Sequence, residues 1–364
     1  MFYSFNMLNI NKLIFWGRES NIEFLRNVSM FMVLMLHANF VAIGKPTVVD
    51  LSVSPMSTVF RWFIEAISIS SVNAFVLISG WFGIKASLKG TLKFIYQILF
   101  FLGISYIIAL CLGVLESPLH SLLDVFQLTP YDWFIKSYFV LMILSPLLNQ
   151  FKNLEVAKQR NLLFLFFGFE AVYGWVAGGK RFFVSGYGPL HLMGIYLLGQ
   201  YMHYSLPQED NTKGLGKMIS GVLNLKSGWN LVLFLICSLM ITAMGIIDLK
   251  FTGGNLSNLI LAYSSPLVVA AAVFLFLAFA RMEIKPSKFI NWLGASSFAV
   301  YLLHCDPIVR QKLFVPLFQQ IDVRVSGIQE VVIVGGALIV IYLLACILDQ
   351  IRIVTWNVFS KRLV

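Results

Sequence analysis

Charged residues are scarce in this sequence. Only 12% of its 364 residues are charged, whereas 59% are hydrophobic and the mean hydropathy is +0.82. A soluble domain of this length does not need that balance, whereas a protein that crosses a membrane many times does. The scarcity of charge therefore predicts a protein embedded in a lipid bilayer.

Cysteine is also scarce. Cys111, Cys237, Cys305 and Cys346 are scattered through apolar segments, with no CxxC pair and no spacing typical of a metal site. The sequence therefore predicts no bound metal and no permanently bound cofactor. The cysteines are interpreted as small residues in packed helices.

The first 18 residues lack a basic start, a short apolar run and a small-residue cleavage site in that order. We therefore expect no cleaved signal peptide, and the first apolar segment can act as an uncleaved anchor. No long linker or low-complexity tract interrupts the chain. Residues 1–364 are therefore expected to form a single membrane domain.

Apolar segments of about twenty residues, the length of a spanning helix, recur along the chain. They predict an all-α, polytopic transmembrane helix bundle with about ten spanning helices, in which Trp and Tyr often lie at the ends of the spans. In the ninth span, Asp306-Pro307 interrupts the apolar pattern. The predicted spans are 22–43, 59–84, 94–115, 131–151, 161–177, 187–206, 229–247, 259–280, 289–309 and 328–350.

Basic residues are distributed unequally between the predicted loops. Of the 27 Lys and Arg residues, 17 lie in the two tails and the even-numbered loops, and eight in the odd-numbered loops. Because cytoplasmic loops carry the excess of Lys and Arg, this bias predicts that both termini are cytoplasmic. The basic cytoplasmic loops also account for the net charge of +10, so this charge does not imply that the protein binds nucleic acid.

Two ionisable residues share one face of the first span. Arg26 and His37 are eleven residues apart, which is about three helical turns and ~16 Å. In a hydrocarbon layer ~30 Å thick, Arg26 would lie at the cytoplasmic edge and His37 near the midplane. Ionisable groups inside a membrane mark functional sites by default.

Each of these residues has a structural alternative. His37 could bond to a neighbouring helix, or stay neutral and act as a general base. Arg26 could be an interfacial anchor paired with Glu23, or could bind phosphate. On the second span, Glu65 and Asn73 share a face and could link helices by hydrogen bonds.

The sequence resembles the acyltransferase 3 family over most of its length. The first motif is Glu23-Phe24-Leu25-Arg26 followed by ten residues and His37. The others, in order, are Asn73 to Phe82 (NAFVLISGWF), Trp133-Phe134 with Tyr138, Leu144 to Asn149 (LSPLLN), Gly186-Tyr187 with His191 and Gly199, and Leu293-Gly294 with Ser297 and Tyr301 to His304. Each motif is weak alone, but their shared order over roughly 280 residues is specific.

The resemblance implies an O-acyltransferase of the bacterial cytoplasmic membrane, in a stand-alone form without an esterase-like domain. The donor would be acetyl-CoA, or another acyl-CoA, and the acceptor a hydroxyl of a cell-surface or lipid-linked glycan. His37 and His304 are the expected catalytic residues, and Trp133, Tyr138 and His191 the expected acceptor-binding residues. Glu170 is a further catalytic candidate on other grounds: it lies roughly nine residues into its span, near the depth of His37, and could orient a base or bind substrate. Arg26 would bind the donor together with Lys85, Lys89 and Lys93, which stand where many members carry a paired arginine motif.

The alternative class is a polytopic transporter or flippase for a glycan or another small molecule, because ionisable groups inside a membrane suit that function too. Transporters often show paired half-repeats with interrupted helices, and this sequence shows no such repeat. The candidate residues also have structural alternatives. Histidines at helix ends often make polar contacts, and Trp133 and Tyr138 could anchor the membrane interface.

Overall fold

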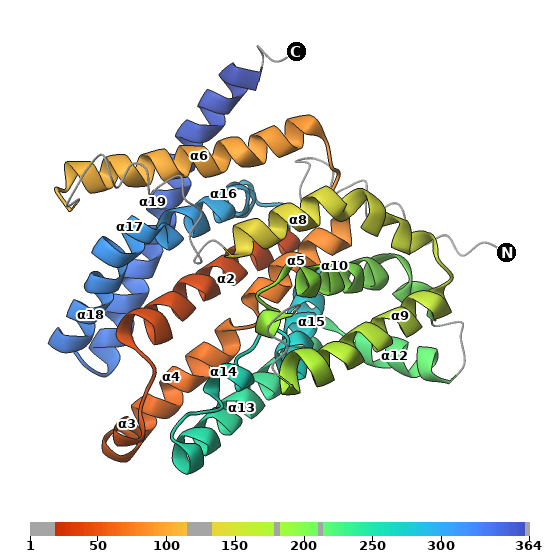
Figure 1. Cartoon of the computed structure of the whole chain (residues 1–364), viewed down its shortest axis with the longest axis horizontal. Helices are drawn as coiled ribbons and strands as arrows, with labels where there is room; N and C mark the ends of the chain where they lie inside the picture. Colours follow the sequence, from red (N-terminus) through yellow and green to blue (C-terminus); the bar gives the residue numbers. More distant parts are fainter. Residues whose placement is uncertain (1–18, 115–132, 178–182, 210–213, 361–364) are drawn as a thin grey trace.

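The computed structural model describes residues 19–114, 133–177, 183–209 and 214–360, and every regular element in these ranges is a helix (Figure 1). The predicted all-α bundle is therefore confirmed. The longer elements are α2 (Ser20–Leu36), α4 (Pro55–Ser68), α5 (Ser71–Phe82), α6 (Leu88–Cys111), α8 (Trp133–Leu148), α9 (Val156–Phe169), α10 (Pro189–Tyr204), α12 (Leu215–Leu223), α13 (Ser227–Thr252), α15 (Pro266–Ala280), α16 (Lys288–Cys305), α18 (Val315–Arg324) and α19 (Ile328–Ser360). The shorter ones are η2 (His37–Ile43), α3 (Val48–Val53), η4 (Asn149–Asn153), η5 (Glu170–Val176), η6 (Val184–Gly186), α11 (Leu206–Glu209), α14 (Ser257–Ile260), α17 (Pro307–Val309) and η7 (Arg310–Phe314).

Six helical runs of the described chain are long and apolar enough to cross a membrane. They are Ser20–Ile43, Pro55–Phe82, Leu88–Cys111, Trp133–Asn153, Ser227–Thr252 and Ile328–Ser360. The other four predicted spans fall on α9 with η5, and on α10, α15 and α16. The protein is thus a polytopic membrane protein, and the count of ten spans stays a prediction.

Two helix boundaries follow directly from proline. In the span predicted at 259–280, the longer helix α15 begins only at Pro266, because proline fits the first turn of a helix but removes a hydrogen bond from a helix interior. The break predicted at Asp306-Pro307 is confirmed, since α16 ends at Cys305 and α17 starts at Pro307. A side-chain oxygen of Asp306 accepts the backbone N–H groups of Ile308 and Val309, which caps the new helix.

Helix α2 lies in the middle of the bundle and packs closely against α16 (Figure 1). A Cβ atom at Gly294 of α16 would lie 3.0 Å from Cβ and 3.1 Å from the backbone oxygen of Glu23, so glycine favours this close approach. The Ser20 hydroxyl lies 2.9 Å from Oδ1 of Asn291, and the amide of Asn27 donates to the carbonyl of Ile290. This pairing brings the carboxyl ends of α2 and α16 together.

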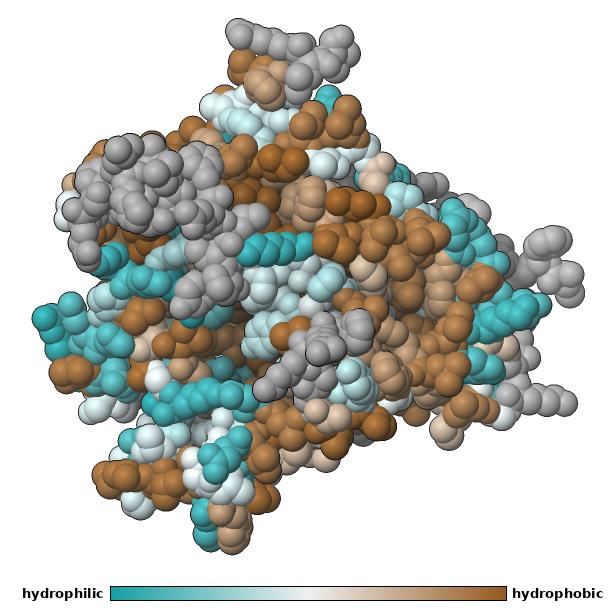
Figure 2. Space-filling model, viewed as in Figure 1, coloured by the Kyte–Doolittle hydropathy of each residue, from teal (hydrophilic) through white to brown (hydrophobic). Residues whose placement is uncertain are grey.

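Apolar side chains cover much of the outer surface. Figure 2 shows hydrophilic residues toward the left and right edges of one face, with hydrophobic residues over much of the area between them. On α19 the exposed side chains include Ile339, Val340 and Leu344. Such a surface suits contact with lipid, where apolar side chains need no polar covering.

The charge bias predicts which side each end of α13 faces. Lys226 and Lys250 are exposed at opposite ends of this 26-residue helix. In a Cys111→Ser background, Lys226→Cys should resist an impermeant thiol reagent in intact cells, whereas Lys250→Cys should react. Labelling after cell lysis is the control, and reaction of Lys226→Cys from outside would reverse the topology.

The helices α5 and α10 approach each other through Gly80 and Gly199. A Cβ atom at Gly80 would lie 2.1 Å from the carbonyl oxygen of Tyr196, and backbone cannot yield as a flexible side chain does. Gly80→Ala should therefore destabilise the protein by about 1–3 kcal/mol or more. We expect a clearly lower thermal midpoint in detergent.

Gly103 provides the matched control, because it lies on an exposed part of α6 where an added Cβ atom would have no neighbouring atom within 4 Å. Gly103→Ala should keep or raise the midpoint, since alanine favours helix by about 1 kcal/mol. Equal midpoints for Gly80→Ala and Gly103→Ala would show that the α5–α10 contact is not tight.

Candidate active site

The carboxyl end of α2 leads directly into a cavity. Arg26, Met30, Val33 and His37 follow one another at intervals of four, three and four residues, so they lie along one face of the helix. The last three line the cavity, and Arg26 lies one turn before it. At His37 the α-helix changes into the π-helical turn η2, a local change that often occurs at functional sites.

His37 makes a hydrogen bond to a second histidine. Its Nδ1 lies 2.9 Å from Nε2 of His304, which is buried near the end of α16. The other nitrogen of His304, Nδ1, lies 2.5 Å from the carbonyl oxygen of Val300. A carbonyl only accepts, so His304 carries its proton on Nδ1 and its Nε2 is left to accept.

The proton between the two rings must then come from His37. With Nδ1–H of His37 donating to Nε2 of His304, Nε2 of a neutral His37 has a free lone pair. His37 is half-buried and lines the cavity, whereas His304 does not. The arrangement thus makes His37 the residue that can accept a proton from a molecule in the cavity.

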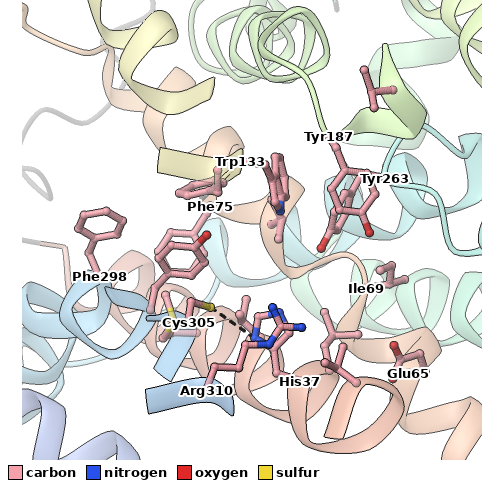
Figure 3. Close-up of a pocket in the computed structure, with 18 residues that line it drawn as sticks. His37, Glu65, Ile69, Phe75, Trp133, Tyr187, Tyr263, Phe298, Cys305 and Arg310 are labelled. Carbon is pink, nitrogen blue, oxygen red and sulfur yellow. Dashed lines mark hydrogen bonds between the residues drawn. The ribbon is translucent and has the colours of Figure 1, made fainter. Parts of the chain in front are cut away.

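The cavity has a volume of about 510 Å³ and a wall of aromatic and aliphatic side chains. Figure 3 shows Trp133, Tyr187 and Tyr263 across the cavity from His37, with Arg310 beside it. Its charged lining residues in the described chain are Glu65 and Arg310. The remaining lining residues are Met30, Val33, Leu36, Val41, Ile69, Val72, Phe75, Phe134, Val184, Phe298, Tyr301 and Cys305.

Glu65 is held by a neighbouring asparagine. Its Oε2 accepts from the amide of Asn39 at 3.0 Å, and Nε of Arg61 donates to Oδ1 of Asn39. Glu65 therefore links α4 to η2 by a hydrogen bond, as its polar position on the second predicted span suggested. Asn73, at the start of α5, likewise links to another helix, through its bond to His191 of α10.

Glu170 and His191 form a pair away from His37. Oε1 of Glu170 lies 2.8 Å from Nδ1 of His191, and Nε2 of His191 lies 2.9 Å from Oδ1 of Asn73. The Asn73 amide donates to the carbonyl of Tyr263 at 2.9 Å. This chain of bonds supports Tyr263 from behind, and neither Glu170 nor His191 lines the cavity.

The remaining candidate residues divide between the cavity and the surface. Trp133 lines the cavity, whereas Tyr138 bonds to Ser79 at 3.1 Å and packs against Phe134 behind the wall. Arg26 is partly exposed, with Nε 3.6 Å from Oε2 of Glu23. The three lysines lie on the surface around the start of α6 and outside the cavity, at Lys85, Lys89 and Lys93.

Sequence reasoning missed several residues of the cavity wall, namely Glu65, Tyr187, Tyr263, Tyr301 and Arg310, as functional candidates. Tyr187 and Tyr301 belong to motifs of the family resemblance, which is a signal that could have found them. No signal in the sequence points to Tyr263 or Arg310, because the contacts that place them come from distant parts of the chain.

The comparisons with known proteins bear on the class of chemistry. The model of the acyltransferase 3 family, described as an acyltransferase domain, matches residues 19–350. None of the curated proteins or solved structures compared with the chain matches it. The family match favours an enzyme over the transporter alternative. Because the match covers nearly the whole chain, the protein belongs to the acyltransferase 3 family and is a membrane enzyme that transfers acyl groups.

Proposed function

We propose that the protein moves an acyl group, an acetyl group in the simplest case, from cytoplasmic acyl-CoA to a hydroxyl of a cell-surface or lipid-linked glycan. The observation that carries this proposal is the position of His37, whose Nδ1 is held by His304 and whose ring faces a cavity of about 510 Å³. The proposed location is the bacterial cytoplasmic membrane, with both termini in the cytoplasm.

The donor would bind along the face of α2 that joins Arg26 to His37. The nucleotide and phosphates of CoA cannot enter hydrocarbon, so they would stay at the cytoplasmic edge near Arg26, whose guanidinium suits phosphate. Met30 and Val33 then offer an apolar path for the pantetheine arm. Over eleven residues this path is ~16 Å long, and it brings the thioester to His37.

His37 would act as the general base. Its Nε2 takes the proton of the acceptor hydroxyl while the hydroxyl oxygen attacks the thioester carbonyl. The new C–O bond forms, the C–S bond breaks, and the CoA thiolate leaves with the proton from Nε2. Throughout these steps Nδ1–H of His37 donates to His304, which fixes the ring and favours its positive charge.

The acceptor would enter from the outer side and pack on the aromatic wall. Rings such as those of Trp133 and Tyr187 suit the apolar face of a sugar, and Glu65 and Arg310 can hydrogen-bond its hydroxyls. His191 and Tyr138 would act indirectly, by holding this wall in place. In the same way Glu170 would orient His191, not His37.

Donor binding is tested at Arg26. Arg26→Ala should weaken acetyl-CoA binding by roughly tenfold or more, because it removes a charged group that bonds phosphate. Arg26→Lys should bind better than Arg26→Ala, because it keeps the charge but loses the planar fork. Calorimetric titration of each purified variant with acetyl-CoA measures these affinities.

Exposed lysines provide the comparison for Arg26. Lys89→Ala should weaken acetyl-CoA binding mildly, and Lys217→Ala, an equally exposed lysine of α12, should have no effect. Unchanged donor affinity in Arg26→Ala would move the donor site away from the start of α2.

The base is tested at His37. His37→Ala and His37→Gln should both insert and bind donor normally, but transfer should fall by roughly 10²–10⁴. Glutamine can keep a hydrogen bond to His304 but cannot accept the proton at neutral pH. The assay is transfer of labelled acetyl from acetyl-CoA to a lipid-linked glycan fraction in proteoliposomes.

Two further histidine variants complete this series. His304→Ala should reduce transfer less than His37→Ala, because His304 only positions the base. His203→Gln is the matched control, since His203 packs on Trp81 outside the cavity. Near-normal transfer by His37→Gln would remove His37 from the mechanism.

A further inference from the structure

Three potential metal ligands meet at the wall of the cavity. They are Nδ1 of His37, Nε2 of His304 and Sγ of Cys305. The Cys305 sulfur lies 3.3 Å from the His304 nitrogen and 3.6 Å from the His37 nitrogen, and the two nitrogens are 2.9 Å apart. Figure 3 shows the sulfur of Cys305 directed at His37.

These distances approach those between ligands of one tetrahedral ion. Zinc binds histidine nitrogen at ~2.0–2.1 Å and cysteine sulfur at ~2.3 Å, so in a tetrahedral site its ligand atoms lie roughly 3.3–3.6 Å apart. Small side-chain rotations would therefore place all three atoms on one ion. His37 and Cys305 line the cavity, so the cavity itself provides the fourth coordination position.

The surroundings support this ligand set. A histidine that binds a metal usually donates its other N–H to a carbonyl or carboxylate, and Nδ1 of His304 already does so to Val300. Loss of the Cys305 proton would supply a thiolate, whose charge offsets part of the ion's two positive charges. Arg310, which lines the same cavity, opposes cation binding and should moderate the affinity.

We propose that His37, His304 and Cys305 bind a divalent ion of the zinc class, and that this ion inhibits the enzyme. A metal on Nδ1 of His37 forces the ring proton onto Nε2, which removes the lone pair that would accept the substrate proton. Binding of the metal ion by these three residues does not depend on which reaction the enzyme catalyses. Its inhibitory effect, in contrast, rests on the proposed function of His37 as the general base.

Cobalt provides a spectroscopic test of the site in the purified full-length protein. One equivalent of Co²⁺ should give the visible bands of a tetrahedral site and a thiolate-to-cobalt charge-transfer band, and Zn²⁺ should displace both. Cys305→Ser, or Cys305→Ala if the serine variant unfolds, should lose the charge-transfer band and bind Co²⁺ at least tenfold more weakly. Cys346→Ser, which alters a buried cysteine outside the cluster, should behave like the unaltered protein.

Absence of the charge-transfer band from the folded protein, or its persistence in both Cys305 variants, would overturn the metal site. The inhibitory part is measured separately, as transfer with Zn²⁺ and after chelation by EDTA. Zn²⁺ should reduce the transfer rate of the unaltered protein at least tenfold, and EDTA should restore it. In the presence of Zn²⁺, Cys305→Ser should keep a larger fraction of its own zinc-free rate than the unaltered protein does.

The two proposals can fail independently. If the protein transfers no acetyl group under any condition, the proposed function fails, and the cobalt spectrum still decides the site. Zinc binding that leaves transfer unchanged would overturn inhibition through His37.

Discussion

The candidate site depends on the hydrogen bond between His37 and His304. It joins the end of the first long helix of the described chain to a residue 267 positions later in the sequence. It also sets which nitrogen of His37 carries the proton. The carbonyl of Val300 fixes His304, and His304 in turn fixes His37. A buried polar group without a partner is costly, so this chain of bonds also stabilises the packing of α2 against α16.

Several other ionisable side chains of the bundle are also paired, because hydrocarbon offers them no partner. Glu170 bonds to His191, Arg352 to Asp349, and Arg160 to Glu209. Only some of these groups reach the cavity, so burial of an ionisable residue alone does not identify a catalytic one. What distinguishes His37 is an unshared nitrogen beside open space.

Two of the three π-helical turns in the described chain border the site. His37, Glu170 and Arg310 each begin such a turn, and the first and last of them line the cavity. A π-turn inserts a residue into the helical spacing and so redirects the side chains around it. The sequence pattern of an apolar helix carries no sign of this change.

Apolar segments predicted the helices well, and the spacing of Arg26 and His37 placed both on one face of α2, because both inferences are local. Contacts between distant segments could not be predicted. The bond from His37 to His304, the partner of Glu65 and the positions of Tyr263 and Arg310 all depend on how helices pack. Glu170 shows the limit, because its depth in the membrane suggested a role beside His37, whereas packing pairs it with His191.

The most direct test of this account is the protonation state of His37, measured by nitrogen NMR on metal-free protein with labelled histidine near neutral pH. The signals of His37 are assigned by their loss in His37→Gln. The account predicts a neutral ring with its proton on Nδ1 and a bare Nε2. A proton on Nε2, in either a neutral or a charged ring, would contradict it.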